Sequence, residues 1–143
     1  MFFHAQEPQK VIATAYCDIG WTKSQRYVDH GTLSVDRKYI SLGSRLRIIF
    51  APAINDATVV KKFFQDVRRT VFHADDTGGK IIGRRIDVWM LDCRDAKKFG
   101  RRPAVIIVEK PGDDSISAKN RYPLPKWLSR KTSKQLNTLG KYS

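Results

Sequence analysis

The sequence is poor in acidic residues, has little cysteine and contains no long apolar run. It carries 14 aspartates and glutamates against 27 lysines and arginines in 143 residues, a formal net charge of +13. No apolar stretch approaches the length of a transmembrane helix. Residues 1–8 have neither a basic start nor a full apolar segment, so we expect no complete signal peptide there, only the remnant of one at most.

The excess of basic residues favours an anionic partner, such as nucleic acid, an acidic polymer or a membrane surface. Basic doublets such as Lys61-Lys62 and Arg84-Arg85 are spread along the chain, and no long basic block stands out. This dispersion weakens a nucleic-acid-binding interpretation. The simpler alternative is a strongly hydrated surface with no specific polyanion.

The two cysteines, Cys17 and Cys93, allow one disulfide or two free buried thiols. Their spacing does not decide between the two, and we favour structural thiols. No metal-binding motif is present, so we expect neither a metal nor a cofactor.

Short runs rich in β-branched and aromatic residues predict a small closed β-barrel with little helix. The expected strands are residues 10–17, 32–36, 45–50, 70–74, 86–91 and 104–108. Residues 95–99 are expected to be a short helix, with Asp95 as its N-cap and Gly100 as its stop. Residues 51–69 fit either a short helix or a protruding hairpin.

We expect a single domain. Residues 1–10 form an N-terminal extension, residues 11–110 form the barrel with an insertion at 51–69, and residues 111–143 form a basic tail that is ordered in part at most. Trp127 is one apolar residue able to dock part of that tail.

Aspartates occupy unusual places in the predicted strands. Asp87 lies between Ile86 and Val88, inside an apolar run. Burial would raise the pKa of this carboxyl and suit it to acid/base chemistry, whereas a half-exposed strand would leave it facing solvent. The pattern alone supports both interpretations equally.

The triplet Asp76-Thr77-Gly78 also occurs in the active sites of aspartic proteases, where two such aspartates share a proton. This chain has one triplet, so a protease would have to be a homodimer. The nearby Ile-Ile-Gly-Arg at residues 81–84 follows the triplet too closely for that fold. We therefore disfavour the protease interpretation.

A longer pattern is more informative. Ala-Thr-Ala-Tyr-Cys at residues 13–17 precedes Gly-Thr-Leu-Ser-Val-Asp-Arg-Lys-Tyr-Ile-Ser-Leu-Gly-Ser at residues 31–44. Ala-Asp-Asp-Thr-Gly-Gly-Lys-Ile-Ile-Gly-Arg-Arg-Ile-Asp-Val-Trp follows at residues 74–89. This order resembles the 3D domain, named for three aspartates and found in murein lytic transglycosylase A and in small secreted bacterial cell-wall proteins. The resemblance covers roughly residues 11–108.

The resemblance implies a double-psi β-barrel that cleaves the β-1,4 bond between N-acetylmuramic acid and N-acetylglucosamine, giving 1,6-anhydro products without water. By motif, the three aspartates are Asp36, Asp76 and Asp87. Asp87 matches the family's general acid/base, and the other two are expected to act as electrostatic and positioning partners in the same cleft. The expected substrate-binding residues are Thr77, Gly78, Gly79, Trp21 and Tyr39.

The resemblance also implies peptidoglycan glycan strands as the partner and a secreted, periplasmic or cell-wall location. We expect a monomer that binds no nucleic acid and has no transmembrane segment. Arg37 and Ser41 stand where the family usually has proline, and His73 and Asp75 add titratable groups beside Asp76. A non-catalytic, expansin-like glycan-binding barrel and a basic nucleic-acid binder are the competing interpretations.

Overall fold

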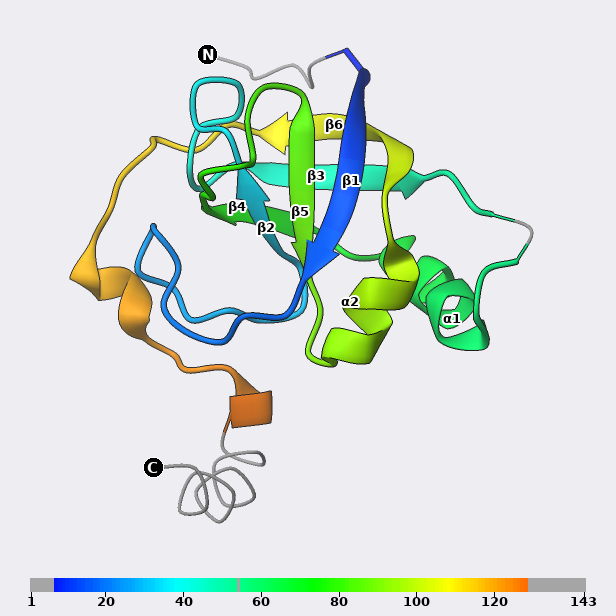
Figure 1. Cartoon of the computed structure of the whole chain (residues 1–143). Coiled ribbons are helices and arrows are strands. Elements are labelled where there is room, and N and C mark those ends of the chain that lie inside the picture. The colour runs from blue at the N-terminus through cyan, green and yellow to red at the C-terminus, as the bar shows by residue number, and fades with distance from the viewer. Residues whose placement is uncertain (1–6, 54, 129–143) are drawn as a thin grey trace.

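A computed structural model describes residues 7–53 and 55–128 of the chain. Six strands close into one barrel in the spatial order β1-β5-β2-β4-β3-β6 (Figure 1). The strands are β1 (Gln9–Tyr16), β2 (Thr32–Val35), β3 (Arg45–Phe50), β4 (Phe72–Asp76), β5 (Arg85–Trp89) and β6 (Arg102–Lys110). The predicted fold class, a small closed all-β barrel with short helices, is confirmed. Parts of the expected N-terminal extension and tail, residues 1–6 and 129–143, lie outside the described residues.

The four-residue strand β2 is paired on both sides. It runs parallel to β4 and antiparallel to β5. Strand β1 runs parallel to β5 and antiparallel to β6, and β3 completes the ring by antiparallel pairing with β4 and β6. Closure pairs both edges of each of these six strands, so the ring has no open edge.

Strand β3 illustrates how the sequence pattern forms the core. Leu46, Ile48 and Phe50 are buried, and the residues between them are exposed or partly exposed. Successive side chains of a strand point to opposite faces, so alternation puts one set inside the barrel. The same core contains, with almost no exposed surface, Leu33, Val35, Phe72, Ala74, Ile86, Val88 and Ile106.

Residues 51–69 contain a helix, and the hairpin alternative is wrong. The helix α1 (Thr58–Val67) lies beside α2 (Cys93–Phe99) at one end of the barrel (Figure 1). Its apolar residues recur three and four positions apart, so they share one face of the helix. The residues of that face that are buried or packed against the core are Val60, Phe63, Phe64 and Val67.

A buried ion pair ties this end of the barrel together. Arg102 donates to both carboxylate oxygens of Asp56, at 2.9 and 3.1 Å. Their side chains are only 8% and 4% exposed. The Arg102 guanidinium also lies 4.9 Å and 4.5 Å from the ring centres of Phe64 and Phe99. The guanidinium also donates to the backbone carbonyls of Phe99 and Ala51. These hydrogen bonds and the two aromatic faces compensate the charge for the water it has lost.

Helix α2 begins earlier than the sequence predicts. Asp92 accepts a hydrogen bond from the backbone N–H of Arg94 at 2.8 Å and is the N-cap, so the prediction of Asp95 as N-cap is wrong. Asp95 lies inside the first turn. The predicted stop is confirmed: Gly100 follows the helix with a φ of 66°, a left-handed conformation that glycine adopts without strain.

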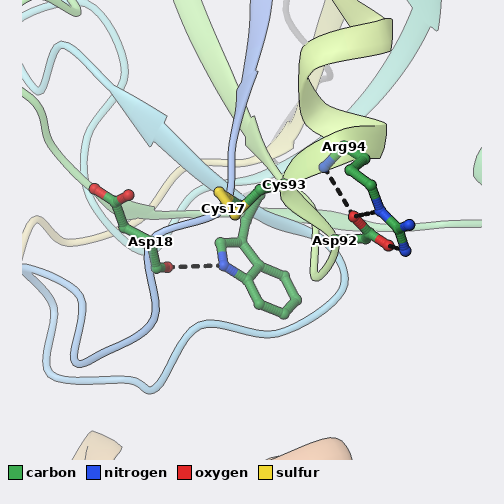
Figure 2. Close-up of a disulfide and its surroundings, with 6 residues drawn as sticks. Cys17, Asp18, Asp92, Cys93 and Arg94 are labelled. Atoms are coloured by element: carbon green, nitrogen blue, oxygen red, sulfur yellow. Dashed lines mark hydrogen bonds and ion pairs between the residues drawn. A yellow bond between two sulfur atoms is a disulfide. The ribbon is translucent and has the colours of Figure 1, made fainter. Parts of the chain in front are cut away.

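Cys17 and Cys93 form a disulfide with a Cα–Cα distance of 5.1 Å, so the favoured prediction of free thiols is wrong. The bond joins the end of β1 to the first residue of α2. Figure 2 shows Asp18 and Asp92 on either side of it, with the carbonyl of Asp18 accepting from the Trp89 indole at 2.9 Å. Two residues distant in sequence are thereby fixed beside the loop that follows β1.

After β6 the chain wraps around the barrel as a segment that we call the C-terminal strap, residues 111–128. Asp114 accepts two hydrogen bonds from the Arg37 Nε and Nη2 groups and another from the backbone N–H of Leu42. Gly112 passes so close to the carbonyl of Leu42 that any side chain there would clash. The start of the strap is therefore locked to the turn after β2.

The end of the strap packs on the long loop between β1 and β2, residues 17–31. Trp127 donates its indole N–H to the carbonyl of Val28 at 3.0 Å. The centre of its ring lies 5.2 Å from the ring centre of Trp89 and 6.0 Å from that of Tyr27. Trp127 thus docks on the barrel. Within residues 7–53 and 55–128, no helix is long and apolar enough to cross a membrane.

Candidate functional site

Four polar residues form a row across four neighbouring strands. Thr14 of β1 pairs with Asp87 of β5, Asp87 pairs with Ser34 of β2, and Ser34 pairs with Asp76 of β4. Neighbouring strands are about 4.8 Å apart, so the two aspartates are about 10 Å apart at Cα, with Ser34 between them. The barrel thus brings Asp76 and Asp87 to one cleft, where the charge of Asp76 acts on Asp87.

Ser34, Asp76 and Asp87 of this row line a cleft of about 320 Å³, and Thr14 is hydrogen-bonded to Asp87 beside it. Its wall comes from the loop after β1, from β2, and from the connection between β4 and β5. The lining residues are Tyr16, Asp18, Ile19, Gly20, Trp21, Val28, Ser34, Asp76, Thr77, Gly78, Ile81 and Asp87. An aromatic ring, small hydrogen-bonding groups and several carboxylates in one cleft suit a polar ligand such as a sugar.

Asp87 is half-buried, and its Oδ1 accepts a hydrogen bond from the Thr14 hydroxyl at 2.9 Å. Burial raises the pKa of Asp87 above its usual value, and the charges of Asp18 and Asp76 raise it further. The Thr14 hydrogen bond and the charge of Arg85 act in the opposite direction. The net direction is upward, so Asp87 is held toward its protonated form.

Asp76 has a different environment because donors surround it. Its Oδ1 accepts from the backbone N–H groups of Lys23 and Thr77, each at 3.0 Å. Its Oδ2 accepts from the Tyr16 hydroxyl at 3.3 Å. Burial raises the pKa of Tyr16, so the phenol remains a donor at neutral pH. Asp76 is therefore fixed in the cleft as a hydrogen-bond acceptor.

Asp36 is not among the residues that line the cleft. Its two oxygens accept backbone hydrogen bonds, from Lys38 at 3.0 Å and from Gly83 at 2.8 Å. These bonds lower the pKa of Asp36. The side chain starts the turn after β2 and ties it to the β4–β5 connection. The expectation that all three aspartates share one cleft is thus met for two of them.

Of the five residues expected to bind substrate, some line the cleft and others do not. Trp21, Thr77 and Gly78 line the cleft. Gly79 and Tyr39 do not, and the Tyr39 side chain is exposed beside Gly83. Within the described ranges, no group of three or more histidines, cysteines or acids is arranged to hold a metal ion.

Sequence reasoning assigned no role to Thr14, Tyr16, Asp18 or Ser34, which the structure places in or beside the cleft. Thr14 and Tyr16 are alternate residues of a strand, and Ser34 is a polar residue between two apolar ones. Such alternation marks a shared face. It does not reveal which other strand lies alongside, because that depends on the closed ring.

The cleft holds two aspartates with different hydrogen-bond partners and has the volume of a small ligand site. Such a barrel belongs to the class of small domains that bind a ligand or act on it. The chain belongs to the 3D domain family, whose sequence pattern matches residues 31–109, more than half of its 143 residues. This confirms the suspected family, which is associated with proteins that act on the cell wall. The chain matches none of the curated proteins with which it was compared.

Proposed function

We propose that the protein is a peptidoglycan lytic transglycosylase that cleaves the β-1,4 bond between N-acetylmuramic acid and N-acetylglucosamine. The observation that carries the proposal is the environment of Asp87: it is half-buried in the cleft, its pKa is raised by burial, and a hydroxyl group orients it. A glycosidic oxygen needs such an acid when its bond breaks.

The proposed reaction uses one acid twice. Protonated Asp87 donates its proton to the glycosidic oxygen, and the bond from that oxygen to C1 of the muramic acid breaks. Positive charge builds on the sugar ring. The C6 hydroxyl of the same sugar then attacks C1, and its proton passes to the Asp87 carboxylate. The product is a 1,6-anhydro sugar, no water is consumed, and Asp87 regains its starting state.

In this scheme Asp76 stabilises the positively charged ring, since its carboxylate is fixed by three donors. Asp18 adds a second carboxylate to the cleft. Asp36 acts indirectly, by holding Gly83 and with it the β4–β5 connection. Trp21 provides an apolar wall for a sugar ring, and Thr77 also lines the cleft.

The surface charge is compatible with this substrate. Cell-wall glycan carries peptide carboxylates and often anionic polymers, and a net charge of +13 favours retention on such a polyanion. The disulfide is typical of proteins that fold outside the reducing cytosol, which fits a secreted or periplasmic location.

The test is mass spectrometry of purified sacculi after incubation with the protein. Anhydro-muropeptides, one water lighter than hydrolase products, are expected from the natural chain. An Asp87→Asn variant is expected to lose roughly 100- to 10,000-fold in rate, the usual range for a general acid. The control is Asp66→Asn, which removes an exposed carboxylate from α1. Full activity in Asp87→Asn would contradict the assignment.

A non-catalytic glycan-binding barrel is the second candidate. The observation that favours it is the cleft volume of about 320 Å³, at the small end of ligand sites. Saturable binding of glycan strands without any anhydro product would support this alternative.

A further inference from the structure

An arginine of the C-terminal strap lies against the aromatic wall of the cleft. Arg121 ends the short 3₁₀ helix Ala118–Arg121, and its guanidinium carbon is 5.2 Å from the ring centre of Trp21. Trp21 lines the cleft and is 45% exposed. Tryptophan is the aromatic residue that attracts a cation most strongly. The positive charge of Arg121 therefore lies next to Trp21, at the edge of the proposed sugar site.

The position of this arginine is fixed by the loop below it. Gln25 accepts hydrogen bonds from the Nε and Nη2 groups of Arg121, at 3.2 and 2.9 Å. The neighbouring Asn120 donates to the carbonyl of Ser24 at 2.8 Å and accepts from Arg26 at 3.3 Å. The guanidinium is therefore oriented before any ligand arrives, which reduces the entropy lost on binding.

The charge of Arg121 remains available. Arg37, Arg47, Arg94 and Arg102 each pair with a carboxylate. In the described part of the chain, no carboxylate forms an ion pair with Arg121, whose only hydrogen-bond partner there is the neutral amide of Gln25. Guanidinium carries five N–H donors, so donors remain for a ligand.

We propose that Arg121 and Trp21 form a subsite for a carboxylate carried by the glycan, with the sugar against Trp21 and the carboxylate on Arg121. The proposal rests on the proposed function. Guanidinium and carboxylate form strong, charge-assisted hydrogen bonds. Arg121 lies outside residues 31–109, so this subsite is an addition by the strap to the family domain. The carboxylate belongs either to the lactyl group of muramic acid or to the attached peptide.

Equilibrium binding to the inactive Asp87→Asn protein tests the subsite with three probes. Chitohexaose carries no carboxylate, peptide-free glycan strands carry lactyl carboxylates, and native strands carry peptide carboxylates. Adding Arg121→Gln is expected to weaken binding of a carboxylate-bearing probe at least tenfold and to leave chitohexaose unchanged. The lactyl carboxyl is free in peptide-free strands and is bound as an amide in native strands. A loss confined to peptide-free strands therefore assigns the lactyl group, and a loss on native strands assigns the peptide.

Arg101→Gln is the matched control, because it removes the same charge from an exposed turn before β6 that lines no described cleft. An equal loss in that control would reduce the effect to overall charge and overturn the proposal. An unchanged affinity of the Arg121→Gln variant for the carboxylate-bearing probes would also overturn the proposal. An equal loss of affinity for chitohexaose would do the same, because Arg121 would then only support the Trp21 side chain. Failure of all three probes to bind the Asp87→Asn protein would overturn the proposed function as well.

Discussion

Asp87 in the cleft and Asp56 at the helical end of the barrel are both carboxylates withdrawn from water, but their neighbours differ. Asp56 is bound by two nitrogens of Arg102, and these hydrogen bonds lower its pKa. Asp87 has one hydroxyl donor, and burial raises its pKa. In the part of the chain that the structure describes, no lysine or arginine forms an ion pair with Asp87, in spite of 27 such residues in the sequence.

The difference separates a structural carboxylate from a chemical one. A cation at hydrogen-bonding distance holds an acid ionised and fixes its position, so the fold depends on the pair staying intact and the acid has no proton to give. Burial without a cation keeps the acid close to protonation, which costs stability and suits proton transfer. The protein places these two environments at different sites of one barrel.

Removing the cation at the structural end is expected to have the largest effect on stability. Arg102→Met leaves Asp56 buried without a cation, with only the backbone N–H of Ala53 as a donor, which we expect to lower the free energy of unfolding by about 3–5 kcal/mol. Urea denaturation measures the change. The double variant Arg102→Met/Asp56→Leu is the control, and it should recover much of the loss because no buried charge is left. A loss below about 1 kcal/mol would show that Asp56 is not held as described.

The disulfide joins the start of the loop that walls the cleft to helix α2, since Cys17 follows β1 and Cys93 begins α2. Its loss in the double variant Cys17→Ser/Cys93→Ser should lower the free energy of unfolding by about 2–5 kcal/mol, through a freer unfolded chain. Thermal unfolding with and without reductant measures this. The natural chain should lose stability in reductant and the variant should not; equal curves for the two proteins would contradict the prediction.

The two aspartates should respond to pH with opposite sign. The pKa of Asp87 is higher in the folded protein than in the unfolded chain, so between these two pKa values the folded protein binds more protons. The contribution of Asp87 to stability therefore falls as pH rises through the range between the two pKa values. Asp87→Asn should therefore be slightly more stable than the natural chain at pH 7, with the gain lost near pH 4. Asp56→Asn should be less stable at pH 7, and its deficit should shrink as pH falls. Denaturation at several pH values tests both signs.

The smallest expected effect concerns the hydroxyl beside the proposed acid. Thr14→Val keeps the side-chain shape and removes the hydrogen bond that lowers the pKa of Asp87. The limb of the pH–rate profile that reports Asp87 should then move to higher pH, while the fold is unchanged. Release of anhydro products measured across the pH range gives the profile. A limb that stays in place or moves to lower pH would separate Thr14 from the titration of Asp87.

Local patterns allowed the strands and the position of Asp87 to be predicted, because alternation and an acid inside an apolar run are visible in the sequence. The row from Thr14 to Asp76 was not predictable, because it depends on which strands lie side by side in the ring. The pairing of Cys17 with Cys93 depends on the same closure. Asp36 was placed in the cleft by motif, but its carboxylate accepts from the backbone N–H of Lys38 in its own turn and from that of Gly83 in the β4–β5 connection.

The order of strands in the ring has a consequence for anyone who trims the chain. A fragment limited to the matched residues 31–109 lacks β1, which pairs with both β5 and β6. Those two strands would then present free N–H and C=O groups along their sides, where further copies can add and grow into aggregates. The fragment would also lack the residues that hold the two acids, Thr14 and Tyr16. The smallest portion worth producing is therefore one that starts before Gln9 and keeps the strap.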